Sequence, residues 1–299
     1  FFYIQKFSRE YKRAMKLQHF CAVLLLAILP YFYGCGSGSY DIEKGEYKDT
    51  TKYKSTGIKL KNSYKIQTPP ALTIQVSGGL NLGMAELSSN FNTVFDSAQF
   101  SKGLNFGVKN GYGVMLIGKI PLHKKGNVRL NVSGNFNRFS SSFLAEKSVF
   151  GEVGYNVFGI GVGLENSFNP SFRLKPYLAA EFQANMISGK ADITSVTTGQ
   201  KRTVTIKNSF RIGYMIYGGV EYMFSNKIGM NFGIKVTNSN QVLKSTKTSD
   251  NPDEVPLRDK KDDTGTIEFG GFKNFIFTSF YLGMNLYIGV KDVIYKFKK

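Results

Sequence analysis

The chain has little of the chemistry on which most enzymes and metal sites depend. Its 299 residues include two histidines, two cysteines and no tryptophan. Both cysteines, Cys21 and Cys35, precede residue 36, so the rest of the chain offers neither a disulfide framework nor a thiolate metal site. We therefore expect no metal site and no cofactor in the body of the protein.

Acidic residues are also scarce. The chain has 39 Lys and Arg against 21 Asp and Glu, which gives a formal net charge of +18. The basic residues are scattered and form no stripe with aromatic residues, so we expect no nucleic-acid partner. The acidic stretch at residues 250–263 lacks EF-hand spacing and contains Arg258, Lys260 and Lys261, which is typical of a solvated charge run and not of a calcium site.

Residues 1–35 have the pattern of a secretory signal peptide with an N-terminal extension, in which residues 1–14 are an upstream extension or a second basic stretch of the signal. Met15-Lys16 is followed by an apolar run, Phe20–Leu29, which is shorter than the about 20 residues that a transmembrane helix needs. The segment Gly34-Cys35-Gly36 resembles the cleavage box of bacterial lipoproteins, in which the cysteine receives the lipid. Cys35 is therefore a lipidation candidate. The alternative is ordinary cleavage within residues 34–39, with Cys35 incidental.

The rest of the chain divides into a linker and one domain. Residues 36–70 are rich in Gly, Ser, Lys, Asp and Thr without a sustained period and end at Pro69-Pro70, which predicts a flexible periplasmic linker. Alternating apolar and polar residues begin at Ala71 and recur along the remaining sequence. We therefore expect residues 71–299 to form a single all-β domain.

The longest alternating segment, Lys273–Val290, indicates what surrounds the domain. Its two faces separate because successive side chains of a strand point to opposite sides of the sheet. One face holds Ile276, Thr278, Phe280, Leu282, Met284, Leu286, Ile288 and Val290, and the other holds Ser279, Tyr281, Gly283, Asn285, Tyr287 and Gly289. So long an apolar face, backed by Gly, Asn and Ser, favours lipid outside and a narrow polar lumen inside.

Seven further segments alternate in the same way. With the last one, the predicted strands are residues 72–82, 106–120, 128–137, 150–164, 174–186, 210–224, 228–236 and 273–290. The phase slips at Val157-Phe158, which predicts a β-bulge. The connections alternate between long and short, which is typical of transmembrane barrels with short periplasmic turns and long outer loops. Because eight is even, both termini are expected on the periplasmic side.

One face of these segments is nearly free of charge. The other face carries Lys109, Lys119, Arg129, Lys175, Glu181, Arg211, Glu221 and Lys235. A charge on a lipid face costs about 2–4 kcal/mol at mid-bilayer. We therefore expect these side chains to form a charge network in the lumen, where Glu181 and Glu221 pair with the cations. Tyr222 and Phe224 are expected in an aromatic belt at a strand end.

Residues 71–290 resemble the eight-stranded outer-membrane barrels of the OmpA/OmpX type, including the porin-like outer-membrane β-barrel domains. The resemblance lies in the strand pattern, the alternation of connections and endings such as Phe280–Val290. It implies an all-β, eight-stranded antiparallel up-and-down transmembrane barrel in the bacterial outer membrane, with outer-membrane lipids and the barrel-assembly machinery as partners. One departure is the basic tail at residues 291–299, since the family often ends in a terminal aromatic; here Phe297 lies near the end.

Several functions remain open. We expect a monomeric structural or surface-interaction protein whose four long outer loops contact an unknown extracellular ligand. One alternative is a small porin-like channel for ions or small solutes. Another is a soluble, lipid-anchored, lipocalin-like barrel with its apolar faces inside. We expect no enzyme, because His123 lies in a short inner turn, away from the outer mouth where a Ser/His/Asp site would bind substrate.

Overall fold

In this computed structural model, the described residues are 40–41, 46–47, 63–87, 106–145, 149–246, 251, 253–257, 259–260 and 273–296. The predicted signal peptide and Cys35 lie outside them. The chain divides into two compact units, one of residues 1–64 and 295–299 and the other of residues 65–294. In the first unit, β1 (Tyr40–Asp41) and β2 (Glu46–Tyr47) form an antiparallel pair within the predicted linker.

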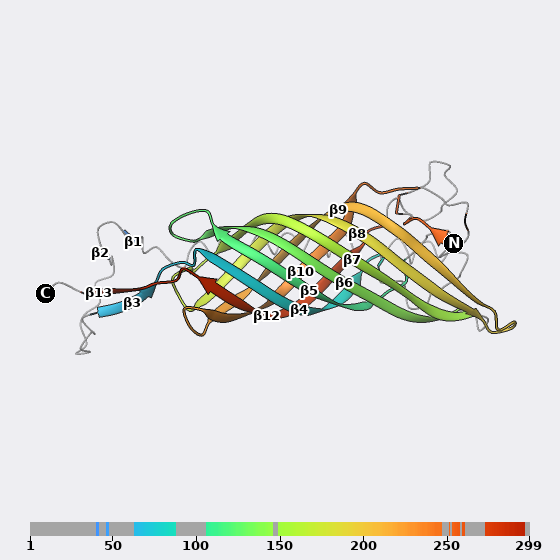
Figure 1. The fold of residues 1–299 in the computed structure, drawn as a ribbon, viewed down its shortest axis with the longest axis horizontal. Coiled ribbons are helices and arrows are strands. Elements are labelled where there is room, and N and C mark those ends of the chain that lie inside the picture. Colours follow the sequence, from blue (N-terminus) through green and yellow to red (C-terminus); the bar gives the residue numbers. More distant parts are fainter. Residues whose placement is uncertain are drawn as a thin grey trace, which may run out of the picture. The chain divides into compact units, whose positions relative to one another are not determined.

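Eight strands of the second unit form one closed antiparallel sheet (Figure 1). They are β4 (Leu72–Met84), β5 (Asn110–Pro121), β6 (Val128–Ala145), β7 (Val149–Ser167), β8 (Leu174–Ser195), β9 (Lys201–Met223), β10 (Ile228–Val242) and β12 (Ile276–Ile288). Each strand pairs with the next in this order, and β12 pairs with β4 to close the ring. The predicted eight-stranded up-and-down barrel is confirmed.

Short elements accompany the barrel. The strand β3 (Ser63–Gln67), at the end of the predicted linker, pairs with β13 (Asp292–Lys296) in the predicted basic tail. The two-residue strand β11 (Glu254–Val255) lies parallel to β9. Across the described ranges, no helix has the length and apolar character to cross a membrane.

The apolar faces of the strands point outward. Large apolar side chains are exposed on every barrel strand, and two of the most exposed are Leu80 at 68% and Phe182 at 76%. The side chains that alternate with them are buried inside the ring. This is the arrangement that the period of two predicted, with the polar face lining the lumen.

The predicted bulge in β7 is wrong. Pairing with β6 and β8 runs without a register shift through Val157 and Phe158, and the two side chains lie on opposite faces, buried and exposed. The apolar residues of β7 change from the inner to the outer face at this point, because the half of the lumen that contains Val153, Tyr155 and Val157 is itself apolar. Register shifts occur elsewhere, between Ile187 and Gly189 in β8 and between Asn238 and Val242 in β10.

Two of the four predicted long loops are mostly strand. The β6–β7 connection spans only residues 146–148 and the β8–β9 connection only residues 196–200. Their flanking strands are long instead, and the β8–β9 hairpin (gold in Figure 1) reaches past the other strands. Residues 202–207 belong to this extension. Phe106 and Val108 lie at the start of the predicted strand 106–120, but they precede β5 and are buried inside.

Candidate functional site

Five charged side chains cross the lumen near the short turns, and we call them the ionic layer: Lys119, Arg129, Glu165, Lys175 and Glu221. Lys119 Nζ lies 2.8 Å from Glu165 Oε2, and Arg129 also pairs with Glu165. Arg129 Nη1 lies 3.3 Å from Glu221 Oε2, and Lys175 Nζ lies 3.6 Å from Glu221 Oε1. All five side chains are at most 4% exposed. Cations and carboxylates therefore alternate in an unbroken chain.

Tyrosine rings cover both ends of the ionic layer. Lys119 Nζ is 4.5 Å from the ring centroid of Tyr177, and Lys175 Nζ is 5.1 Å from that of Tyr287. The hydroxyls of Tyr177 on β8 and Tyr281 on β12 are 2.8 Å apart. Since β12 is three strands away from β8, and β9 is three strands away from β6, the Tyr177–Tyr281 and Arg129–Glu221 contacts join different walls. Side chains thus fill the lumen at this level.

Polar side chains, most of them uncharged, fill the middle of the lumen. Glu181 accepts hydrogen bonds from the hydroxyls of Ser133 and Tyr217, and Asn81 Nδ2 donates to Asn137 Oδ1 at 3.0 Å. Among the described residues, the ion pairs within 4 Å include neither Glu181 nor Lys235, although both side chains are buried. Glu181 is therefore held by hydroxyl donors instead of the expected cations.

The half of the lumen farther from the short turns, which we call the outer half, is packed with rings. We call Phe106, Phe139, Tyr155, Phe275 and Phe277 the aromatic layer. Their centroids are 4.9–6.4 Å apart in six edge-to-face pairs. Aliphatic side chains surround them: Leu87, Val108, Val153, Val157, Ile187, Ala191, Val204, Ile206 and Leu257. Edge-to-face packing of this kind adds about 0.5–1.5 kcal/mol per pair beyond burial.

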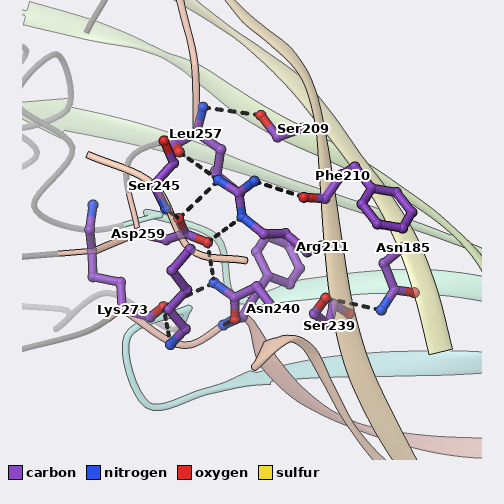
Figure 2. A network of polar contacts seen from close by, with 12 residues as sticks. Asn185, Ser209, Phe210, Arg211, Ser239, Asn240, Ser245, Leu257, Asp259 and Lys273 are labelled. Carbon is purple, nitrogen blue, oxygen red and sulfur yellow. Dashed lines mark hydrogen bonds and ion pairs between the residues drawn. The ribbon is translucent and has the colours of Figure 1, made fainter. Parts of the chain in front are cut away.

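The segment between β10 and β12 is tied to the outer end of the lumen through Asp259. Arg211 donates from Nε to Oδ2 at 2.8 Å and from Nη2 to Oδ1 at 2.9 Å (Figure 2). Asn240 Nδ2 donates to Oδ2 at 2.8 Å, and the Ser245 amide donates to Oδ1 at 2.9 Å. Asp259 is fully buried. Its carboxylate thus has four donors, two of them from a guanidinium.

Arg211 and Asn240 also form hydrogen bonds with the backbone of this segment. Arg211 Nη2 donates to the Leu257 carbonyl at 2.9 Å, and Asn240 Oδ1 accepts from the Phe275 amide at 2.6 Å. Phe275 belongs to the aromatic layer, so the polar cluster in Figure 2 and the aromatic layer hold one segment together. Further out, Arg202 pairs with Asp253 at 2.7 Å beside the β9–β11 pairing.

The sequence-predicted charges fall into three places. Lys119, Arg129, Lys175 and Glu221 meet in the ionic layer, Glu181 and Lys235 lie in the middle, and Arg211 lies at the outer end. Lys109 precedes β5 at the outer end, half-buried, and its amide donates to Ser141 Oγ.

Sequence reasoning missed two carboxylates, Glu165 and Asp259. Glu165 continues the face of Gly159, Gly161 and Gly163, so alternation could have found it. Asp259 was assigned to a solvated charge run, which is wrong for this residue: it is buried against Arg211, 48 positions earlier in the chain. No local pattern signals that pairing.

The described residues contain no group of three or more His, Cys, Asp or Glu side chains placed to hold a metal ion. His123 is exposed in the β5–β6 turn, and its Nδ1 accepts a hydrogen bond from the Lys125 amide at 3.3 Å.

No protein-family model matches the chain, and no curated protein matches it. Among solved structures, Neisserial surface protein A aligns with 12% identity over 73% of this chain and 97% of its own, with a TM-score of 0.40. Ail, the attachment invasion locus protein of Yersinia pestis, aligns with 10% identity over 73% and 98%, with a TM-score of 0.34. The N-terminal β-barrel domain of Pseudomonas aeruginosa OprF aligns with 10% identity over 73% and 98%, with a TM-score of 0.28.

Proposed function

We propose that the chain is an integral β-barrel protein of the bacterial outer membrane, with both termini periplasmic and a structural or surface-interaction role. The observation that carries this proposal is the outward belt of large apolar side chains on all eight strands. One member from each strand, 43–76% exposed, is Leu80, Val114, Val132, Ile160, Phe182, Ile216, Phe232 and Leu282. Soluble proteins rarely expose continuous apolar patches beyond a few hundred Å².

The direction of the faces favours this function over a soluble lipocalin-like barrel. A ligand-carrying soluble barrel needs an apolar interior and a polar exterior, whereas here the exterior is apolar and half of the interior is polar and ionic. Burying such an exterior in lipid, with every strand edge paired, satisfies both apolar and backbone groups.

The packing of the lumen favours a closed barrel over a channel for ions or small solutes. The ionic layer bridges different walls at one level, and the aromatic layer fills the other end. Eight strands enclose an interior that side chains can fill. The outer surface then remains for interaction, namely the extended β6–β9 sheet and the segment between β10 and β12.

Fractionation of a Cys35→Ala form tests the membrane proposal without any contribution from a lipid anchor. We expect the protein to require detergent and to migrate differently on an SDS gel with and without boiling. In planar bilayers we expect no conductance steps. Solubility without detergent and without a mobility shift would refute the membrane barrel, whereas steady conductance steps would favour the channel.

A further inference from the structure

The three short turns at one end of the barrel share a composition, and none of their residues belongs to the ionic layer. They are residues 122–127, 168–173 and 224–227, and they contain no Asp or Glu. Each turn carries exposed cations: Lys124 and Lys125 in the first, Arg173 in the second and Lys227 in the third. The structure pairs none of these four with a carboxylate of the described residues.

Each turn also exposes a large apolar side chain beside its cations. Leu122 is 56% exposed, Phe172 is 67% exposed and Phe224 is 53% exposed. The Phe224 ring packs edge-to-face with Tyr222 at 5.4 Å, as an aromatic belt at a strand end would. Apolar groups that alternate with Lys and Arg suit the boundary between acyl chains and charged headgroups.

Backbone contacts fix the positions of these turns. The Gly126 amide donates to the His123 carbonyl, and the Ser167 amide donates to the Asn127 carbonyl, which ties the first turn to β7. Gly126 has a φ of +71°, and an added Cβ would lie 2.4 Å from a carbon of Pro69, so the first turn packs tightly against the chain entering β4. The exposed cations and apolar side chains of the three turns, which we call the collar, are therefore held in place by the backbone.

The opposite end is different, because acidic residues there pair with three of its exposed cations. Lys190 pairs with Asp192, Arg202 pairs with Asp253 and Lys207 pairs with Glu254. The positive character is thus a property of the turn end and not merely of the basic chain.

We propose that the three turns bind the phosphate groups of anionic phospholipids in the leaflet at the turn end, with Leu122, Phe172 and Phe224 inserted among the acyl chains. This rests on the proposed membrane barrel. Unpaired Lys and Arg at a membrane surface each contribute favourably with anionic lipid. The exposed aromatic groups favour a bilayer over a soluble polyanion, which would contact the cations alone.

The absence of tryptophan from the chain makes a fluorescence test direct. Phe172→Trp and Phe224→Trp each place one reporter at the turn end, and Phe182→Trp places one on the lipid-facing wall. Each full-length variant is folded into phosphatidylcholine vesicles with a minor fraction of phosphatidylglycerol. The bromine quencher is carried either by phosphatidylglycerol or by phosphatidylcholine.

We expect quenching by brominated phosphatidylglycerol to be about threefold stronger at positions 172 and 224 than at position 182, because the collar enriches anionic lipid. Equal quenching at positions 172, 224 and 182 would overturn the proposal, as would lack of quenching by either lipid at positions 172 and 224. If position 182 is not quenched by either lipid, the membrane barrel itself fails, and the two failures are distinguished.

Two variants with the same net charge distinguish an effect of the cations in the turns from an effect of the overall charge of the protein. The collar variant of Phe172→Trp carries Lys124→Gln, Lys125→Gln, Arg173→Gln and Lys227→Gln. The control removes the same charge at the outer end with Lys190→Gln, Lys201→Gln, Arg202→Gln and Lys207→Gln. We expect the preference for phosphatidylglycerol at position 172 to disappear in the collar variant and to persist in the control. Persistence in both variants, or loss in both, would refute binding by the turns.

Discussion

The two ends of the lumen are closed by opposite chemistries. Near the short turns, five charged side chains and two tyrosine rings cross the interior, and every contact comes from the barrel strands themselves. At the outer end, aromatic and aliphatic side chains fill the same width, and part of that material comes from the segment between β10 and β12. A narrow barrel can thus be filled either by long charged side chains or by added chain.

This difference indicates which of the two closures can open while the barrel stays folded. The ionic layer cannot leave without breaking strands, because its residues lie on β5, β6, β7, β8 and β9. The outer closure depends in part on Asp259 and its donors, which join a connecting segment to β9 and β10. We therefore expect damage to the ionic layer to cost barrel stability, and damage to the Asp259 cluster to free the segment first.

Arg129→Met is expected to have the largest effect, because it removes the central cation and leaves two buried carboxylates poorly paired. Breaking a buried ion pair from one side typically costs about 3–5 kcal/mol. Urea unfolding of the vesicle-embedded protein measures the loss. Arg138→Met is the matched control on the same strand, since Arg138 is exposed. Equal losses from both variants would contradict the role of the ionic layer.

Phe275→Ala tests the aromatic layer, where Phe275 packs against Phe106, Phe139 and Tyr155. Truncation of a buried Phe costs about 3–5 kcal/mol, but here part of the loss should appear as local opening of the segment that ends at Phe275. We expect faster proteolysis within residues 243–275 and a smaller shift in barrel unfolding than for Arg129→Met. Phe280→Ala on the outward face of β12 is the control, and faster cleavage in it would refute the local effect.

Asp259→Asn keeps the shape of the side chain but removes the charge that Arg211 and Asn240 contact. Loss of a charge-assisted buried contact should cost about 1.5–3 kcal/mol. We expect increased proteolysis of the same segment, with the unboiled gel mobility unchanged. Asp253→Asn, at an exposed position, should leave cleavage unchanged.

A combination of variants shows whether the two closures are independent. We propose that either closure alone blocks the lumen, so neither Arg129→Ser nor Asp259→Asn should give conductance steps in a planar bilayer. The double variant should give steps if the barrel remains folded, which the unboiled gel mobility checks. Steps from Asp259→Asn alone would mean that the ionic layer does not close the lumen.

These differences also explain what the sequence could predict. Alternation placed Lys119, Arg129, Lys175 and Glu221 inside, because a strand has only two faces and a charge cannot face lipid cheaply. Alternation could not say that the outer half of the lumen is apolar, so the change of apolar face at Val157 was mistaken for a bulge.

Contacts across the ring cannot be predicted from the alternation of residues along one strand. The pairing of Arg211 with Asp259 depends on how the segment between β10 and β12 folds back, and the segment itself was interpreted as a loop. Similarly, hydroxyl donors from β6 and β9 hold Glu181, because the closed ring brings Ser133 and Tyr217 to it. Sequence patterns specify which face a residue occupies, whereas the closed ring specifies its partner.

The smallest loss of stability is expected for the exposed pair of Lys190 and Asp192, which resembles the ionic layer only in geometry. Lys190 Nζ lies 2.9 Å from Asp192 Oδ2, nearly the distance of the Lys119–Glu165 pair, but the two side chains are 63% and 46% exposed. Water screens such a pair, so Lys190→Gln should change the free energy of unfolding by less than about 0.5 kcal/mol. A loss as large as that of Arg129→Met would show that burial does not decide the strength of these pairs.

The pKa of Asp192 gives a second test of the exposed Lys190–Asp192 pair. Asp192 lies in the part of β8 that extends past the apolar belt. Hydrogen bonds from Lys190 and then Thr203 lower the pKa of Asp192 below its ordinary value. A lowered folded-state pKa contributes stability above the unfolded-state pKa, and this contribution is lost as the pH falls through the folded-state pKa. In Lys190→Gln, NMR titration of the carboxyl carbon should show the pKa of Asp192 rising toward its ordinary value, held partly down by the Thr203 hydroxyl. An unchanged pKa would mean that the pair is not formed in solution.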